Sequence, residues 1–322
     1  MKSLMLLIAA FFIGTFSLSE KKKVWGFYGH KKINHLAVFS LPTPMFGFYK
    51  EHINEITERA VNPDKRRHAV ENEAPKHYID LDHYCNNREA VFDTVPKKWK
   101  DAVAKYTLDT LLAYGTVPWT VNQEYYKLIK AFQEQDWVRV IKVSADLGHY
   151  IADAHVPLHT TENYNGQLTN QHGIHGFWES RLPELFFDEY QLFVGKAQFI
   201  DYPQYYIWER LRESHLALDS VLAIDLLLRT GEDAERMYSF EPRGKNIVKT
   251  YSLNYSTKYH QMLNGMIERR MKTAIKAVSS YWYTAWVMAG QPNLPTSFKM
   301  VILAEDDSLT TTKTNKVIRV HE

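Results

Sequence analysis

Apolar residues spaced three and four positions apart recur along this chain, and this spacing constrains the possible fold more than any other feature. It places side chains on one face of an α-helix, where they can pack against a neighbouring helix. Residues 136–154 show it through Ile141, Ala145 and Tyr150. Period-two alternation with β-branched residues is scarce outside 299–303 and 316–320. The sequence therefore predicts an all-α fold with few strands.

Three further segments are candidate helices. One opens at Pro96 and stops at Gly115, which suits the end of a helix. Residues 216–228 are apolar almost all round, which predicts a helix in the centre of a bundle. The longest candidate covers about residues 258–289 and ends before Gly290. Helices of this number and length predict a multi-helix bundle.

Length and composition favour one large domain. The chain has 322 residues, of which 45% are hydrophobic and 14% aromatic, so it can form a packed core. No fixed-period repeat and no low-complexity tract is visible. We expect a single domain over residues 20–292, followed by a C-terminal tail over 293–322.

The N-terminus has the pattern of a secretory signal. An apolar run over residues 4–16 is followed by the small residues Ser17 and Ser19, which predicts a signal peptide over residues 1–19. The run is too short to span a bilayer comfortably. We expect export to the periplasm or the medium. The alternative is retention by an N-terminal anchor, because three lysines follow the apolar run at 21–23.

Charge and cysteine content exclude some classes of protein. There are 39 basic and 37 acidic residues, so no global basic field indicates a nucleic-acid-binding protein. Cys85 is the only cysteine, which excludes an intramolecular disulfide. The fold must therefore be stabilised by its core, by metal ions, or by both. The fourteen histidines direct attention to metals, because histidine is the commonest metal ligand.

The most informative motif lies at the end of the helix predicted over 136–154. His149 and Asp153 are four residues apart, so one helical turn directs both side chains to the same point. Pro157 then disrupts the helix and bends the chain, which lets His159 approach from another direction. These three residues predict part of a metal site.

A second pair repeats the four-residue offset, since His175 and Glu179 follow sixteen residues later. Asp64 and His77 supply two more nitrogen and oxygen donors upstream. Imidazole and carboxylate donors without thiolate suit hydrolytic zinc, which keeps an open position for water. The set is large enough to hold more than one ion. Asp80 and Asp82 are candidates for orienting the imidazoles or for an ordinary loop role.

These motifs resemble the superfamily that joins S1/P1-type nucleases with zinc-dependent bacterial phospholipases C. The opening Trp25-Gly-Phe-Tyr-Gly-His30 matches the family in the nuclease style, and the element formed by His149, Asp153 and His159 matches without gaps. The similarity covers roughly residues 25–179. It implies a single all-α catalytic domain of the phospholipase C/P1 nuclease type, with a cleft for two or three zinc ions.

The resemblance also implies a ligand set for each ion. One zinc would be held by Asp64, His77, His149 and Asp153. A second would be held by His159, His175 and Glu179 and would retain a water. A third would be held by His30, Trp25 and the bridging carboxylate of Asp153. Two ions are expected, and the third requires Trp25 to be the mature N-terminus, because its amino nitrogen would be a ligand.

The implied activity is hydrolysis of a phosphodiester. Zinc lowers the pKa of bound water from about 15.7 to about 7, which supplies hydroxide at neutral pH. The catalytic residues would be Asp64, as proton acceptor, and Asp153, as the bridging ligand. Glu179 matches the phospholipases, whereas the nucleases usually have Asp there, and the opening motif matches the nucleases.

Three functions remain open at this point. The interpretation leans slightly to a phospholipase C that cleaves phospholipid headgroups, with transient contact to a membrane surface and no protein partner. The alternative is a nuclease that cleaves single-stranded DNA or RNA. The third is a non-catalytic helical protein that zinc stabilises.

Overall fold

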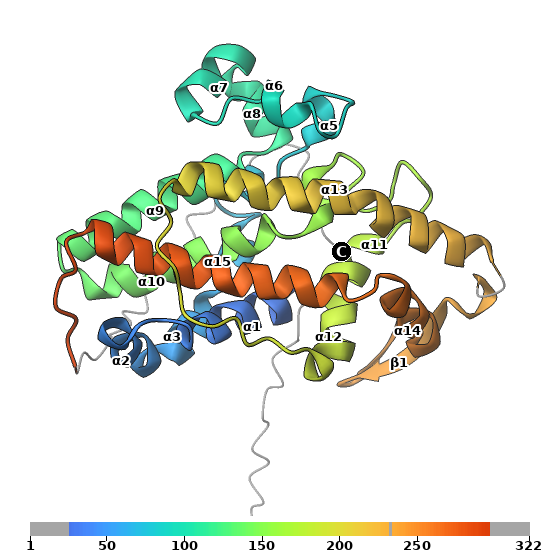
Figure 1. Cartoon of the computed structure of the whole chain (residues 1–322). Coiled ribbons are helices and arrows are strands. Elements are labelled where there is room, and N and C mark those ends of the chain that lie inside the picture. Colours follow the sequence, from blue (N-terminus) through green and yellow to red (C-terminus); the bar gives the residue numbers. More distant parts are fainter. Residues whose placement is uncertain (1–25, 232–233, 297–322) are drawn as a thin grey trace, which may run out of the picture.

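The protein is represented by a computed structural model that describes residues 26–231 and 234–296. The expected all-α class is confirmed, because the described residues are mostly helical and include one two-stranded sheet (Figure 1). The first half contains α1 (Phe27–Val38), α2 (Thr43–Glu51), α3 (Ile53–Arg59), α4 (Asn62–Arg66), η1 (Ala74–His77), α5 (Leu81–Tyr84), α6 (Val91–Thr94), α7 (Trp99–Tyr106), α8 (Leu108–Tyr114), α9 (Val117–Gln133) and α10 (Trp137–Asp153). The second half contains η2 (Pro157–Thr160), α11 (Ile174–Gly176), the π-helix η3 (Phe177–Arg181), α12 (Leu182–Phe186), η4 (Phe187–Glu189), α13 (Pro203–Thr230), η5 (Ala234–Arg236), β1 (Tyr238–Arg243), β2 (Asn246–Tyr251), α14 (Leu253–Met262) and α15 (Met266–Met288).

The core lies where α15 packs against α1, α9 and α10 (Figure 1). Trp282 of α15 is fully buried and stacks on Tyr49, with ring centroids 5.1 Å apart. Its indole N–H donates to the carbonyl oxygen of Ser144 in α10 at 3.0 Å. Burial of large aromatic side chains is a major source of stability in such a bundle. This core provides a rigid support for α1 and α10, which carry candidate site residues.

Helix α10 begins and ends close to the predicted positions. The carboxylate of Asp136 caps its first turn by accepting a hydrogen bond from the Arg139 N–H at 3.1 Å. The helix ends at Asp153, and Pro157 begins the 3-10 helix η2 in a new direction. The expected bend before His159 is therefore confirmed.

Two predicted helices are each divided in two. The segment 96–115 contains α7 and α8, which separate at Thr107, where φ is 70°. The segment 258–289 contains α14 and α15, which separate at Asn264 and Gly265, with φ of 47° and 73°. A residue with a positive φ cannot continue a right-handed α-helix, so each break changes the chain direction. The prediction of continuous helices was wrong at these two places.

The predicted central helix over 216–228 is part of the longer α13, and it is not buried all round. Leu226 is 45% exposed and Leu227 is 60% exposed, whereas Leu218 and Val221 are buried. One face packs on the core and the other faces solvent, so the prediction of a central position was wrong. Within the described residues, no helix combines the length and apolar character needed to cross a membrane.

Strands β1 and β2 form an antiparallel hairpin that the sequence interpretation missed. Gly244 has a φ of 57° at the first position of the two-residue loop, a conformation that glycine adopts readily. The two strand candidates at 299–303 and 316–320 lie outside the described residues, as do the predicted signal peptide and most of the predicted tail.

Candidate metal centre

Eight of the nine predicted ligands converge on one buried region between α1 and α10. Trp25, the ninth, lies outside the described residues. The eight come from seven elements: His30 from α1, Asp64 from α4, His77 from η1, His149 and Asp153 from α10, His159 from η2, His175 from α11 and Glu179 from η3. Six are at most 4% exposed, and only Asp64 at 22% and Glu179 at 14% reach the surface.

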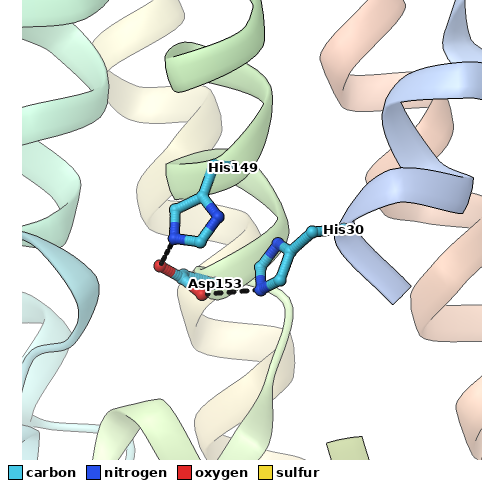
Figure 2. A group of neighbouring side chains, drawn as sticks. All are labelled: His30, His149 and Asp153. Atoms are coloured by element: carbon cyan, nitrogen blue, oxygen red, sulfur yellow. Dashed lines mark ion pairs between the residues drawn. The ribbon is translucent and has the colours of Figure 1, made fainter. Parts of the chain in front are cut away.

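Close packing of α1 on α10 brings His30 to the ligands of α10. Gly148 faces Asn34 of α1, whose amide donates to the carbonyl oxygen of Ala145 at 3.0 Å. The His30 ring stacks on the His149 ring, with centroids 4.1 Å apart. Figure 2 shows His30 and His149 approaching Asp153 from two sides. The local sequence Gly148-His149 thus combines close helix packing with a donor.

The first donor set surrounds one oxygen of Asp153. Its Oδ2 lies 3.0 Å from His77 Nδ1 and 3.2 Å from His149 Nε2, and these two nitrogens are 3.0 Å apart. Asp64 Oδ1 lies 3.6 Å from each of the two nitrogens. Bonds of about 2.0–2.2 Å to a tetrahedral zinc place its ligand atoms about 3.3–3.6 Å apart. The observed separations of 3.0–3.6 Å lie within or slightly below this range, so the four donors are close enough together to hold one ion.

The second donor set contains three atoms. Glu179 Oε2 lies 2.8 Å from His175 Nε2 and 3.4 Å from His159 Nε2, and the two nitrogens are 3.1 Å apart. These are three corners of a similar tetrahedron, and the fourth corner has no donor among these three side chains. The pair His175 and Glu179 was predicted as one α-helical turn. It instead joins α11 to the π-helix η3, a wider turn that is frequent at functional sites.

His30 lies between the two sets. Its Nε2 is 3.4 Å from Asp153 Oδ1 and 3.3 Å from Glu179 Oε1. Asp153 therefore presents one oxygen to the first set and the other to His30. Glu179 likewise presents Oε2 to the second set and Oε1 to His30. The sequence interpretation did not anticipate this second bridging carboxylate. The side chain length of Glu179 was the available signal, because the extra methylene extends its reach.

Backbone carbonyl groups fix the orientation of three imidazoles. The carbonyl oxygens of Ala60, His77 and Tyr164 accept from Nδ1 of His149, His159 and His175 at 2.8, 2.6 and 3.1 Å, respectively. Each bond leaves the Nε2 lone pair directed into a donor set. Asp82 has the loop role, because it accepts from the Thr161 hydroxyl at 2.6 Å and from the Glu162 N–H at 3.0 Å.

Protonation states in the centre favour binding of a cation. Burial lowers the pKa of His77 to about 4, so its imidazole is neutral at pH 7. Burial opposes ionisation of Asp153 and Glu179, but the surrounding imidazoles hold the pKa of each carboxyl well below its usual value. Burial also disfavours a charge on His30, yet its hydrogen bond to Glu179 and the charge of Asp153 raise its pKa to about 9. The neutral His77 and the ionised carboxylates thus favour a bound cation, whereas a cation that binds to His30 must displace its proton.

A buried ionic network joins three of the elements that carry ligands. Glu73, 1% exposed, pairs with Arg66 of α4 at 2.8 Å and with Lys76 of η1 at 2.6 Å. Tyr150 of α10 donates its hydroxyl to the same carboxylate and accepts from Arg66 at 3.0 Å. Arg66 also pairs with Asp146 at 2.9 Å. The network holds α4, η1 and α10 in fixed relative positions.

A pocket adjoins the centre on the side of His30 and Glu179. Aliphatic side chains dominate its lining, and Trp178 is the aromatic residue among them. The aliphatic residues are Ile33, Ala152, Val156, Pro183, Ile267 and Ala274. Such a surface suits an apolar part of a ligand next to a charged centre.

In the part of the chain that the structure describes, the histidines left out of the predicted ligand set remain outside it. His172, three residues before His175, has an exposed side chain, and its carbonyl oxygen accepts from Tyr251 and Arg229 at 3.3 and 3.2 Å. His155 is buried and its Nδ1 donates to the Ile151 carbonyl oxygen at 2.7 Å. The eight donors of the centre are therefore five imidazoles, including His30, and three carboxylates.

Fold and side chains together define a mainly helical protein with a buried centre of metal-ligand type. No family model matches the sequence, and no curated protein matches it. The alpha-toxin from an avian strain of Clostridium perfringens matches at 10% identity with a TM-score of 0.49, over 84% of this chain and 66% of that chain. The alpha toxin from Clostridium absonum matches at 10% identity with a TM-score of 0.48, over 83% and 64%. This chain thus spans less than two thirds of the length of either toxin.

Proposed function

We propose that this protein is a zinc-dependent phosphodiester hydrolase, with phospholipid as its substrate class. The observation that supports it is the spacing of the donor atoms, which are 2.8–3.6 Å apart and include no thiolate. Structural zinc sites are usually closed and often bound by thiolate, whereas hydrolytic sites use nitrogen and oxygen donors and keep a position for water. The second donor set, with three protein donors, has the hydrolytic pattern.

Zinc in these sets would be held by Asp64, His77, His149 and Asp153 in one and by His159, His175 and Glu179 in the other. When bound, it supplies positive charge that acidifies water and stabilises negative charge on a phosphate. A further ion would use His30 with the second oxygens of Asp153 and Glu179, and Trp25 would complete its ligands if residue 25 is the mature N-terminus.

The chain's own groups would perform the proton transfer. Asp64, 22% exposed, lies at the edge of the first set and can accept the proton that water loses as its oxygen forms a bond to phosphorus. The bond from phosphorus to the leaving oxygen breaks, and that oxygen takes a proton back from the Asp64 carboxyl group or from solvent. The products are an alcohol and a phosphomonoester. The aliphatic lining of the neighbouring pocket would exclude water and hold an apolar part of the substrate.

The same lining favours a lipid over a nucleic acid. Single-strand nucleases use aromatic platforms for base stacking, worth about 1–3 kcal/mol per base. The pocket beside His30 and Glu179 offers Trp178 alone for that purpose. Glu179 and the absence of a second cysteine also favour a phospholipid substrate over a nucleic acid.

The test is hydrolysis by the zinc-loaded protein of phosphatidylcholine, single-stranded DNA, RNA and a chromogenic phosphodiester, with and without chelator. We expect chelator-sensitive cleavage of the chromogenic substrate and of phosphatidylcholine. His175→Asn should abolish it, and His172→Asn is the matched control, because that histidine is exposed and outside the donor sets.

Two results would redirect the proposal. Cleavage of DNA or RNA without cleavage of phosphatidylcholine would assign the protein to nucleases. Tight zinc binding without cleavage of any of the four substrates would leave a zinc-stabilised helical protein. We also propose export, which mass spectrometry of the mature N-terminus and cell fractionation would test.

A further inference from the structure

The outer face of hairpin β1–β2 exposes large apolar side chains. Alternation along β1 directs Tyr238, Phe240 and Pro242 outward, and Ile247 faces outward from β2. Phe240 is 73% exposed and Ile247 is 74% exposed. The register pairs Pro242 with Ile247, so the apolar residues form a continuous surface near the turn.

The inner face of the hairpin is held firmly on the protein. Glu241 Oε1 accepts from Arg181 of η3 at 2.6 Å, and Arg243 pairs with Glu184 of α12 at 3.0 Å. At the end of the hairpin away from the turn, Tyr251, which pairs with Tyr238 on the opposite face, stacks its ring on Phe177 of η3 with centroids 3.9 Å apart. An isolated two-stranded hairpin is marginally stable, so these contacts are what keeps it folded. The apolar outer face is therefore a defined part of the fold.

These contacts also place the hairpin beside the metal centre. Arg181 and Phe177 are the two ends of η3, the π-helix that carries Glu179. The hairpin occupies the end of the molecule where α12 and α14 lie (Figure 1). A surface that binds the outer face would lie close to the centre and its pocket.

Charge around the apolar face is mainly positive. On the inner face of the hairpin, Arg243 pairs with Glu184 and Glu241 with Arg181, which leaves Lys245 and Lys249 as the unneutralised charges of residues 238–251. Lys245 is in the turn, and Lys249 is exposed and lies over the Tyr238 ring at 4.0 Å. Lysines bordering exposed apolar side chains suit the headgroup region of an anionic bilayer, where the ammonium groups remain hydrated.

We propose that hairpin β1–β2 binds an anionic lipid surface by inserting Phe240 and Ile247 between the lipids while Lys245 and Lys249 contact the headgroups. The proposal extends the proposed function, since it identifies the surface through which the hydrolase reaches lipid. Binding to vesicles does not require hydrolysis, however, so the two can fail separately.

The test is co-sedimentation of the full, chelator-treated chain with vesicles of phosphatidylcholine alone or with phosphatidylglycerol added. We expect binding to the mixed vesicles that weakens as salt is raised. Phe240→Ser with Ile247→Ser should lower the partition coefficient by about ten-fold or more. Lys245→Gln with Lys249→Gln should lower it by roughly thirty-fold at low salt and by much less at high salt.

The matched control is Leu108→Ser with Tyr126→Ser, which removes two exposed apolar residues from α8 and α9, away from the hairpin (Figure 1). It should bind vesicles as the wild type does. Cleavage of the soluble chromogenic phosphodiester should be equal in all these variants, because none alters a donor. That readout tests the proposed function independently.

Equal vesicle binding by the wild type and the Phe240 and Ile247 variant would overturn the proposal. A second result would also overturn it: the wild type binds no mixed vesicles and sediments as a dimer, whereas the Phe240 and Ile247 variant sediments as a monomer. The face would then be an interface between two copies of the chain.

Discussion

Gly148 of α10 and Asn34 of α1 are so close that a β-carbon on residue 148 would lie 2.1 Å from Asn34 Oδ1. No real contact of this kind is so short, so any side chain at residue 148 must displace α1 or the Asn34 amide. His30 lies one turn before Asn34 on α1. The position of His30 in the centre therefore depends on a glycine in the other helix.

Gly148→Ala is expected to destabilise the protein by about 1–3 kcal/mol through overpacking. It should also weaken zinc binding, because α1 carries His30. Thermal unfolding with and without zinc measures both effects. Gly47→Ala in α2 is the control, since a β-carbon there meets nothing within 4 Å. It should raise stability by about 0.5–1 kcal/mol through helix propensity. Equal effects of the two substitutions would contradict the packing argument.

Asp153→Asn is expected to remove zinc and activity together, because one side chain serves both His30 and the first donor set. An amide offers one acceptor oxygen and no charge, so it cannot replace both carboxylate oxygens. Metal analysis after dialysis and turnover of the chromogenic phosphodiester measure the result. Full zinc occupancy with normal turnover would be inconsistent with the assignment of Asp153.

Glu179→Asp is expected to keep the charge but to lose the contact between Glu179 Oε1 and His30, now 3.3 Å. The shorter side chain cannot reach both His30 and the pair His159 and His175 from the same backbone position. We expect a lower zinc content per chain than in the wild type, measured by metal analysis. Glu162→Asp, a change in a half-exposed glutamate, should leave the zinc content unchanged. An unaltered zinc content in the Glu179→Asp variant would show that one carboxylate oxygen at this position is enough for full zinc binding.

Glu73→Gln is expected to change the pH dependence of stability. Burial would raise the pKa of Glu73, but Arg66 and Lys76 outweigh it and lower the pKa from 4.5 to about 2. A carboxyl group whose pKa is lower in the folded state stabilises that state at pH values above its ordinary pKa. This stabilisation is lost as the pH falls through the pKa of the folded state. A shift of this size corresponds to on the order of 3 kcal/mol.

The stability difference between wild type and Glu73→Gln should therefore be largest above about pH 5 and shrink toward about pH 2. Urea unfolding of both proteins in chelator at several pH values measures it. Glu134→Gln is the control, because its exposed pairs with Lys130 and Arg139 should contribute about 0.5 kcal/mol or less. A difference that stays constant with pH would argue against the ionic contribution of Glu73.

Zinc is expected to raise the unfolding temperature of the chelator-treated protein. Binding to the folded state alone stabilises it by about 4 kcal/mol when free zinc is 1,000 times the dissociation constant. Differential scanning calorimetry with added zinc measures the shift. Magnesium is the control, because it prefers oxygen ligands and the centre contains five imidazoles. Equal stabilisation by both ions would contradict a nitrogen-rich zinc site.

The sequence was sufficient to predict the parts of the fold that local rules determine. The apolar spacing over residues 136–154 and the helix breaker Pro157 placed α10 closely, because both signals act over short stretches of the chain. The four-residue offset brought His149 and Asp153 together for the same reason. The convergence of the eight donors was expected only from the motif resemblance. Contacts between segments that are distant in the sequence, such as those of His30 and Glu179, have no local sequence signal.

The errors arose where one residue changed the chain direction or where burial depended on distant elements. Asn264-Gly265 is a common turn pair, and the sequence signal was available although the apolar spacing continued across it. The hairpin had a similar signal at Gly244, but its inner face is stabilised by Arg181, which lies far away in the sequence. The exposed face of α13 could not be distinguished from a buried one, because leucine occupies both.

The wide turn of η3 makes the length of this segment critical. Deleting Phe177 or Trp178 would shorten the turn toward a regular α-helix, yet it would rotate Glu179 by about 100° relative to His175. Glu179 would then point away from the imidazoles, and Arg181 would lose Glu241. Insertions and deletions that a surface loop accepts are thus excluded here, and the chain can vary at these positions only by substitution.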